Sequence, residues 1–252
     1  MNKLFVFDLD DTLIDNVHDY AEPLLDACRF IIRMLGNKAP HVSKIIALEQ
    51  EIDKRLVKEI NPSTEKPYFW SMERFPTSLI EVYREICRQS KVMTDKSAEE
   101  QLYDIGLRAF DETMYKRNIH PDALSVLDFF RKQSDVCLLC SKGDPKVQEK
   151  KVAALHSVGI NHFAAVRIVD EKTPEVFREI VGRFGHCSPF SVGNSYSSDI
   201  RPALDAGFRG IYIPVETWET IDKMNSILSE VDIEKCIVLQ NLKDLKTQYG
   251  RL

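Results

Sequence analysis

Long apolar runs are missing from this chain of 252 residues. No run approaches the roughly 20 residues that are needed to cross a bilayer. The N-terminal run Met1–Phe7 also meets Asp8 too soon for a secretory signal. A strong charge of one sign is missing too, and a formal net charge of −5 provides no general attraction to nucleic acid or anionic membranes. We therefore expect a cytoplasmic protein with neither nucleic acid nor membrane as partner; its oligomeric state is not readable from these features.

The cysteines lack the density of a disulfide scaffold, since the chain has only six and they are scattered. Cys137 and Cys140 form a C-x-x-C pattern, which can bind metal or act in redox chemistry. They lie in the apolar run 136–140, which is typical of a buried strand. An offset of three along a strand sends two side chains to opposite faces. We therefore expect two core cysteines.

Apolar residues make up 44% of the chain and charged residues 29%, as in an ordinary globular protein. From residue 118 onward, short apolar runs alternate with helical patterns, which predicts a parallel α/β sheet. The sheet is expected to have about five strands: Leu4–Phe7, Val136–Cys140, Ala164–Ile168, Phe190–Gly193 and Gly210–Val215. The pairs Asp144-Pro145 and Thr173-Pro174 predict the starts of two helices between them.

Residues 16–117 have a different pattern. Apolar residues keep helical spacing over 21–35 and again over 45–60. Ser78-x-x-Glu81 and Ser97-x-x-Glu100 predict capping boxes that open two more helices. The expected fold class is thus α/β: a Rossmann-like parallel-sheet core formed by residues 1–15 and 118–252, with an all-helical cap domain inserted at 16–117.

One stretch of the cap, residues 61–76, contains three prolines, four aromatic residues and two basic residues. One interpretation is a lid whose Trp70 or Arg74 meets a substrate, because loops on rigid scaffolds often carry function. The other is an aromatic plug that joins two helices. The sequence leaves both open.

The first strand leads directly into Asp8-Leu9-Asp10-Asp11-Thr12. Two acids at i and i+2 are expected to point to the same side of an extended chain. Two like charges so close raise each other's pKa unless a cation relieves them. One acid can then act as a nucleophile while the other transfers protons. A plain polar turn is the alternative, since Asp and Thr are common in turns.

Three later sites supply partners for these acids at the carboxyl ends of expected strands, where open α/β sheets bind ligands. Ser141 follows the second strand and can hold an oxyanion, with Lys142 beside it as a candidate substrate contact. Lys172 precedes a helix start and can neutralise a phosphate. Asn194 and Asp199 follow the fourth strand, and their oxygens together with Asp8 suit Mg²⁺.

These motifs, in this order, resemble those of haloacid dehalogenase superfamily hydrolases that have a helical cap after the first strand. The resemblance covers essentially the whole chain, although the cap matches only in position and helical character. The matching residues are D-x-D-x-T at Asp8, Asp10 and Thr12, then Ser141, Lys172, and the fourth motif at Gly193 to Asp199.

The resemblance implies a Mg²⁺-dependent phosphatase that acts on a small phosphorylated metabolite. Asp8 would form an aspartyl-phosphate, and Asp10 would protonate the leaving alcohol and then activate water. Thr12 would orient Asp10 or steady the loop, Ser141 would bind phosphate oxygens, and Lys172 would offset the crowded negative charge. The implied metal ligands are Asp8, the backbone carbonyl of Asp10, Asn194 and Asp199.

The fourth motif departs from the family pattern, because Asn194 stands where an aspartate is usual. An amide oxygen can still bind Mg²⁺, but with one negative charge less. Four readings therefore stay open: a phosphatase, a phosphomutase, a dehalogenase, or a relative that binds phosphorylated ligands without turnover. A dehalogenase needs no acid at Asp10, because halide leaves without a proton.

Overall fold

The computed structural model describes residues 2–182, 184–217, 227 and 234–252. The chain forms two compact units. The core unit comprises Met1–Val17 and Tyr115–Leu252, and the cap unit comprises His18–Met114. These bounds differ from the insertion expected at 16–117 by at most three residues.

The core unit contains a parallel six-stranded sheet with the order β5-β4-β1-β6-β7-β8. Its strands are β1 (Lys3–Phe7), β4 (Val136–Lys142), β5 (Phe163–Val169), β6 (Ser188–Gly193), β7 (Arg209–Tyr212) and β8 (Cys236–Val238). The five predicted strands are all present, and the α/β class with a parallel sheet is confirmed. The sequence missed β8, because three residues are too few for a periodic pattern.

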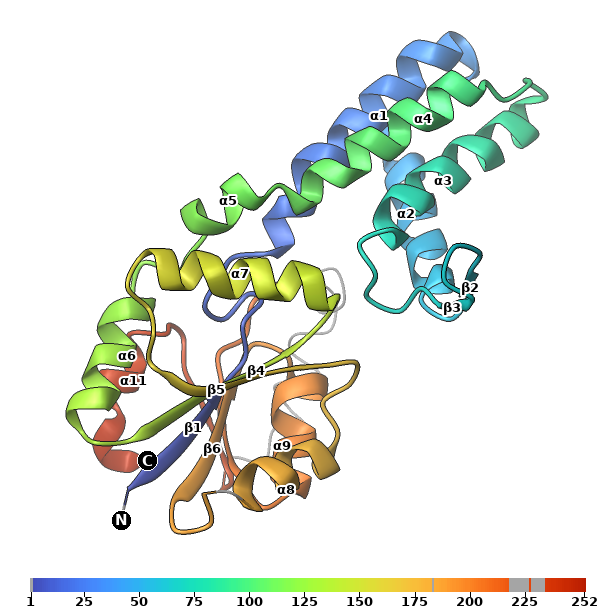
Figure 1. The fold of residues 1–252 in the computed structure, drawn as a ribbon. Coiled ribbons are helices and arrows are strands. Elements are labelled where there is room, and N and C mark those ends of the chain that lie inside the picture. Colours follow the sequence, from blue (N-terminus) through green and yellow to red (C-terminus); the bar gives the residue numbers. More distant parts are fainter. Residues whose placement is uncertain (1, 183, 218–226, 228–233) are drawn as a thin grey trace. The chain divides into compact units, whose positions relative to one another are not determined.

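Helices cover both faces of this sheet (Figure 1). Alternate residues of β1 face opposite ways: Phe5 and Phe7 pack in the hydrophobic cluster that includes α6 (Ala123–Lys132) and α7 (Pro145–Ser157). Leu4 and Val6 pack in the cluster that includes α8 (Pro174–Gly182) and α9 (Arg201–Asp205). Strand β4 alternates likewise.

The two cysteines of β4 follow this alternation. Cys137 belongs to the first cluster and Cys140 to the second, as predicted. Both thiols are buried and free, and burial raises the pKa of Cys137 to about 12 and that of Cys140 to about 11. Their place is in the core.

Helix starts in the core unit follow the predicted signals. The side chain of Asp144 accepts hydrogen bonds from Lys146 N (2.9 Å) and Val147 N (3.4 Å), and Pro145 is the first residue of α7. Thr173 Oγ1 accepts from Val176 N (3.4 Å) at the start of α8. Near the carboxyl terminus lies the short helix α11 (Asp244–Thr247).

The cap unit consists of α1 (Ala21–Leu35), α2 (Val42–Leu56), α3 (Arg74–Ser90) and α4 (Lys96–Leu107). The short α5 (Glu112–Arg117) crosses the boundary between the units. A small antiparallel ribbon of β2 (Ile60–Asn61) and β3 (Lys66–Pro67) also belongs to the cap unit. The expectation of an all-helical cap is therefore wrong at this ribbon. Pro62 and Pro67 interrupt the helical spacing there, and Asn61 Oδ1 accepts from Ser63 N at 2.8 Å in an Asx turn.

Both predicted capping boxes in the cap are wrong. Ser78 lies inside α3, where its hydroxyl donates to Phe75 O and to Glu49 Oε1, each at 2.8 Å. The N-cap of α4 is Asp95, whose side chain accepts from Ser97 N (2.8 Å). A serine that bonds back to the preceding turn of its own helix has the same sequence spacing as a cap.

The stretch 61–76 packs into the cap unit. Tyr68 and Phe75 are buried in the hydrophobic core of the cap. Arg74 Nε lies 2.7 Å from Asp53 Oδ1, its guanidinium also donates to the carbonyl of Phe69, and it lies 4.9 Å from the ring of Trp70. These contacts agree with the plug interpretation, while substrate contacts of Trp70 and Arg74 stay a prediction.

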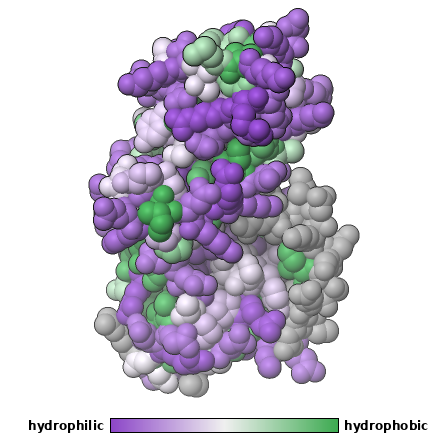
Figure 2. Space-filling view, turned by 90° about the vertical axis from the view of Figure 1, so that its right-hand side faces the viewer, coloured by the Kyte–Doolittle hydropathy of each residue, from purple (hydrophilic) through white to green (hydrophobic). Residues whose placement is uncertain are grey.

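The surface view in Figure 2 is mainly hydrophilic, with hydrophobic residues in separate spots. Exposed large apolar side chains include Leu25 on α1 and Met93 after α3. Among the described residues, every helix is too short or too polar to cross a membrane.

Candidate active site

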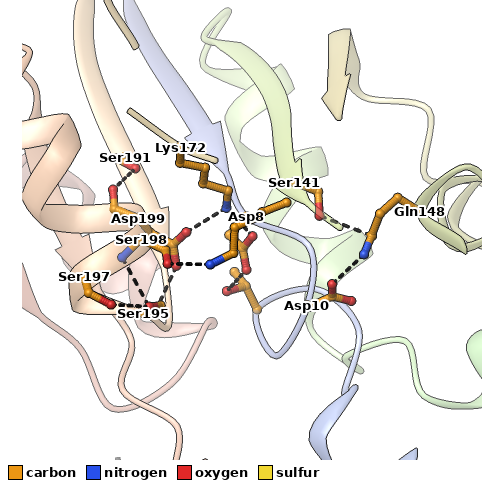
Figure 3. A network of polar contacts seen from close by, with 12 residues as sticks. Asp8, Asp10, Ser141, Gln148, Lys172, Ser191, Ser195, Ser197, Ser198 and Asp199 are labelled. Atoms are coloured by element: carbon orange, nitrogen blue, oxygen red, sulfur yellow. Dashed lines mark hydrogen bonds and ion pairs between the residues drawn. The ribbon is translucent and has the colours of Figure 1, made fainter. Parts of the chain in front are cut away.

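Asp8 is the first residue beyond β1, and its backbone N still pairs with Val192 O of β6 at 2.8 Å. Alternation along the strand therefore directs its side chain to the face of Val6, where α8 and α9 lie. On this face Lys172 Nζ forms ion pairs with Asp8 and, at 2.7 Å, with Asp199 Oδ1 (Figure 3). The side chain of Lys172 is 3% exposed, so one buried ammonium bridges two carboxylates.

Burial is the largest single influence on the pKa of Asp8 and on that of Lys172. It raises the pKa of Asp8 to about 7, and the negative charge of Asp199 adds to the rise, while Lys172 opposes it. For Lys172, burial lowers the pKa, but the charges of Asp199 and Asp8 outweigh burial and raise it overall. Lys172 is therefore the cation that makes the two buried carboxylates tolerable.

Thr12 and Ser195 supply hydrogen bonds to these carboxylates. Thr12 Oγ1 donates to Asp8 Oδ2 at 3.2 Å. Thr12 was expected to orient Asp10 or steady the loop, and its hydroxyl orients Asp8. Ser195 N donates to Asp199 Oδ2 at 2.9 Å. Both carboxylates thus have a fixed orientation.

The loop after β6 brings Asp199 close to the sheet because residue 193 is glycine. A Cβ placed on Gly193 would lie 2.3 Å from Asp199 Oδ2. The hydroxyl of Ser191 also donates to the carbonyl of Asp199 at 2.8 Å. Asn194, next to Gly193, is buried in the same loop.

Asp10 does not share a cation with Asp8. The chain turns at Leu9, whose carbonyl accepts from Leu13 N (2.9 Å) and Ile14 N (3.0 Å). Beyond this turn Asp10 Oδ1 lies 2.6 Å from Lys151 Nζ. Because β1 ends at Phe7, the turn provides each carboxylate with its own lysine. The negative charge of Asp10 still contributes to the raised pKa of Asp8, as expected for two neighbouring acids.

Ser141 lies on the other face of β4 from Cys140, toward α7. Its hydroxyl donates to Gln148 Oε1 at 3.2 Å, and Gln148 Nε2 donates to Asp10 Oδ2 at 2.8 Å (Figure 3). The amide of Gln148 therefore connects two predicted site residues. Lys142, one residue on, donates to Ser198 Oγ at 3.0 Å.

The sequence reasoning missed Gln148 and Lys151, which are both buried on α7. They are three residues apart and so lie on the same helical face. Two polar residues on a face that otherwise carries Val147, Val152 and Leu155 were the available signal.

The candidate ligands at this site are all oxygen atoms, which is the ligand type that Mg²⁺ prefers. Asp8 and Asp199 are close enough to share one ammonium, and Asn194 and the backbone carbonyl of Asp10 are further oxygen donors. Among the described residues, three or more His, Cys, Asp or Glu side chains are nowhere arranged to hold a metal. Mg²⁺ needs only one or two carboxylates and keeps several waters, so two carboxylates meet its requirement.

No family model and no curated protein matches the chain. Solved structures do match. A haloacid dehalogenase-like hydrolase from Xanthomonas campestris is 18% identical, with a TM-score of 0.64 and coverage of 100% of this chain and 99% of that one. The hydrolase YfnB from Bacillus subtilis, bound to magnesium, is 17% identical, with a TM-score of 0.59 and coverage of 99% of both chains.

A predicted phosphoglycolate phosphatase from Haemophilus somnus is also 17% identical, with a TM-score of 0.58 and coverage of 98% of both chains. Other matching structures are haloacid dehalogenases. The chain therefore has the fold of haloacid dehalogenase-like hydrolases. At these identities, the likeness defines the fold and leaves the activity open.

Proposed function

We propose that this protein is a Mg²⁺-dependent phosphatase that hydrolyses a small phosphomonoester through an aspartyl-phosphate on Asp8. The observation that carries the proposal is the buried pair of Asp8 and Asp199 bridged by Lys172. Among the proteins of this fold, one is described as a predicted phosphatase and another as bound to magnesium. Both descriptions agree with the donor set of this site.

In the first step, a carboxylate oxygen of Asp8 attacks phosphorus while the bond from phosphorus to the alcohol oxygen breaks. Asp10 enters this step as the protonated carboxylic acid, with a proton taken up from solvent, and donates that proton to the departing oxygen. Lys172 holds Asp8 in place and offsets the charge of the phosphoryl group. The hydroxyl of Ser141, which otherwise donates to Gln148 Oε1, rotates to donate to a phosphoryl oxygen. Mg²⁺, when bound, neutralises part of the negative charge on the phosphoryl oxygens.

In the second step, Asp10 accepts a proton from a water molecule that attacks the phosphorus of the aspartyl-phosphate. The bond between phosphorus and the Asp8 oxygen breaks, which releases inorganic phosphate and regenerates the Asp8 carboxylate. The same residue thus acts first as acid and then as base. A phosphomutase would differ only in the acceptor, a sugar hydroxyl in place of water.

A dehalogenase is the second candidate. Two observations favour it: matching structures include haloacid dehalogenases, and Asn194 removes one charge from the metal-binding loop. In that reaction, Asp8 attacks carbon and halide leaves without a proton. Asp10 would then not be needed as a proton donor to the leaving group. The network that Lys151 and Gln148 build around Asp10 therefore favours the phosphatase.

The test compares wild type with Asp8→Asn on 4-nitrophenyl phosphate, with Mg²⁺ and with a chelator, and on 2-chloropropionate. We expect phosphate release only by wild type with Mg²⁺ and a loss on the order of a thousandfold in Asp8→Asn. Asp205→Asn, on the surface of α9, is the control and should retain full activity. Halide release without phosphate release would establish the dehalogenase, and equal rates for wild type and Asp8→Asn would overturn the nucleophile assignment.

A further inference from the structure

Lys151 is a buried lysine of α7 in the core unit. Its side chain is 3% exposed, while that of its ion-pair partner Asp10 is 22% exposed. The ammonium lies 2.6 Å from Asp10 Oδ1 and 2.5 Å from Asn16 Oδ1, and 5.5 Å from the centre of the Tyr115 ring. Removing an ammonium from water is costly unless it is paired and hydrogen-bonded. The geometry of this pair is therefore strongly constrained.

Gln148 holds the other carboxylate oxygen of Asp10. Its Nε2 donates to Asp10 Oδ2 at 2.8 Å, while its Oε1 accepts from Ser141 Oγ at 3.2 Å. Gly143 leaves the space for this amide, because a Cβ on Gly143 would lie 2.4 Å from Gln148 Nε2. The two oxygens of Asp10 are thus bound by two different residues of one helix, which fixes both the position and the plane of the carboxylate.

The helix that carries both residues is itself well anchored. Asp144 caps α7, and Val147, Val152 and Leu155 are buried along it. Side chains on a packed helix hold a site group more accurately than side chains on a loop. Asp10, in contrast, lies in the turn after β1. Its carboxylate is therefore held in place by side chains of α7 and not by a regular element of its own.

We propose that Lys151 and Gln148 are positioning residues that hold the Asp10 carboxylate where it meets the oxygen of the leaving alcohol. This inference rests on the proposed phosphatase function. Because the Gln148 amide also contacts Ser141, it sets the distance between the proton donor and the residue that binds the phosphoryl group. A displacement of about 1 Å in such a group can cost on the order of a hundredfold in rate.

The test uses the dependence of the first step on the leaving group. A nitrophenolate leaves readily without a proton, whereas an alkoxide must be protonated as it departs. We therefore measure release of the alcohol in the first turnover, with excess Mg²⁺, for 4-nitrophenyl phosphate and for an alkyl phosphate. A merely structural loss would slow both substrates equally.

In Lys151→Met we expect alkyl alcohol release to fall about a hundredfold and nitrophenol release less than about threefold, with KM nearly unchanged. Lys151→Arg, which retains the cation, should recover much of the alkyl rate. Gln148→Met should reproduce the selective loss at about tenfold, and it tests the same idea if Lys151→Met does not fold. Lys146→Met, on the exposed side of α7, is the matched control and should leave both rates unchanged.

The outcomes separate the two proposals. If wild type hydrolyses neither ester, the phosphatase function and the positioning role both fail. If wild type is active and folded Lys151→Met and Gln148→Met lose both substrates equally, or neither, the positioning role alone is overturned. A selective loss of the alkyl substrate with rescue by arginine supports it.

Discussion

At Gly193, the absence of a side chain decides where Asp199 can lie. A Cβ there would come within 2.3 Å of Asp199 Oδ2 and 2.5 Å of Asp199 Cγ. These atoms cannot move far, because Lys172 and Ser195 hold the carboxylate. Residue 193 therefore controls the second carboxylate of the site without any contact to a substrate.

Gly193→Ala should displace Asp199 and so separate it from Asp8. We expect kcat/KM on 4-nitrophenyl phosphate to fall at least about tenfold, and the free energy of unfolding to fall by about 1–3 kcal/mol from overpacking. Steady-state kinetics and urea unfolding measure the two effects. The matched control is Gly182→Ala at the end of α8, where a Cβ meets open space, and it should leave activity unchanged. Wild-type kinetics in Gly193→Ala would contradict the steric argument.

The candidate site was only partly predictable at this scale. Asp8, Lys172 and Asp199 were found because each follows a strand or precedes a helix, where polar residues stand out against apolar runs. Gln148 and Lys151 were missed, since a polar residue in a helix is usually solvent-exposed and its sequence does not reveal burial. The alternation rule also failed for Asp10, because a turn after Leu9 ended the strand geometry on which the rule depends.

Between α2 and α3 of the cap unit, a carboxyl group is buried in an apolar interior. Glu49 is 2% exposed, and its carboxyl accepts from Ser78 Oγ at 2.8 Å. Burial raises the pKa of Glu49 to about 7 from an ordinary value of 4.5, although the bond from Ser78 opposes the rise. The packing of these two helices should therefore depend on pH.

The folded cap binds the proton of Glu49 more tightly than the unfolded chain does. Stability from this group is complete below pH 4.5 and is lost as the pH rises through about 7. The total change is on the order of 3 kcal/mol. We expect Glu49→Gln to abolish this loss, measured by urea unfolding at pH 5 and pH 8 with Trp70 fluorescence in a Trp218→Phe background.

The control for this change is Glu51→Gln, an exposed position in the same helix, which should keep the wild-type dependence on pH. An equally steep dependence in Glu49→Gln would show that another group of the cap is responsible. Activity should be measured in parallel, because a change in kcat without a change in stability would point away from helix packing.

Helices and strands with a strong periodic pattern of apolar residues could be predicted from the sequence. Features defined by single local hydrogen bonds, such as helix caps and the short ribbon, could not. The five longer strands of the sheet and helix α1 were found from apolar spacing alone. In contrast, the capping box proposed at Ser78 was a buried back-bonded serine, and the ribbon at 60–67 was hidden by the expectation of helix. Such features depend on which side chain reaches which backbone group, and spacing carries little of that information.

The molecule as a whole carries a net charge of −5, so its general field does not attract a phosphate ester. Attraction of a phosphate ester must therefore come from cations at the site itself. Lys172 and Lys151 balance two of the three carboxylates of Asp8, Asp10 and Asp199. Asp8 and Asp199 share a single lysine, and an aspartate at position 194 would add to the negative charge that attracts Mg²⁺.

Asn194→Asp should therefore strengthen Mg²⁺ binding while destabilising the metal-free protein, since it adds a negative charge at a buried position of the loop that also carries Asp199. A ligand that binds only the folded state raises the thermal midpoint in proportion to its binding free energy. We expect saturating Mg²⁺ to raise the midpoint of wild type, and to stabilise Asn194→Asp by about 1.4 kcal/mol more than wild type, which corresponds to tenfold tighter binding. Asp199→Asn should abolish the shift, and Asn161→Asp, which adds the same charge at an exposed position, should leave it unchanged. Identical Mg²⁺ shifts in wild type and Asn194→Asp would place the amide outside the metal site.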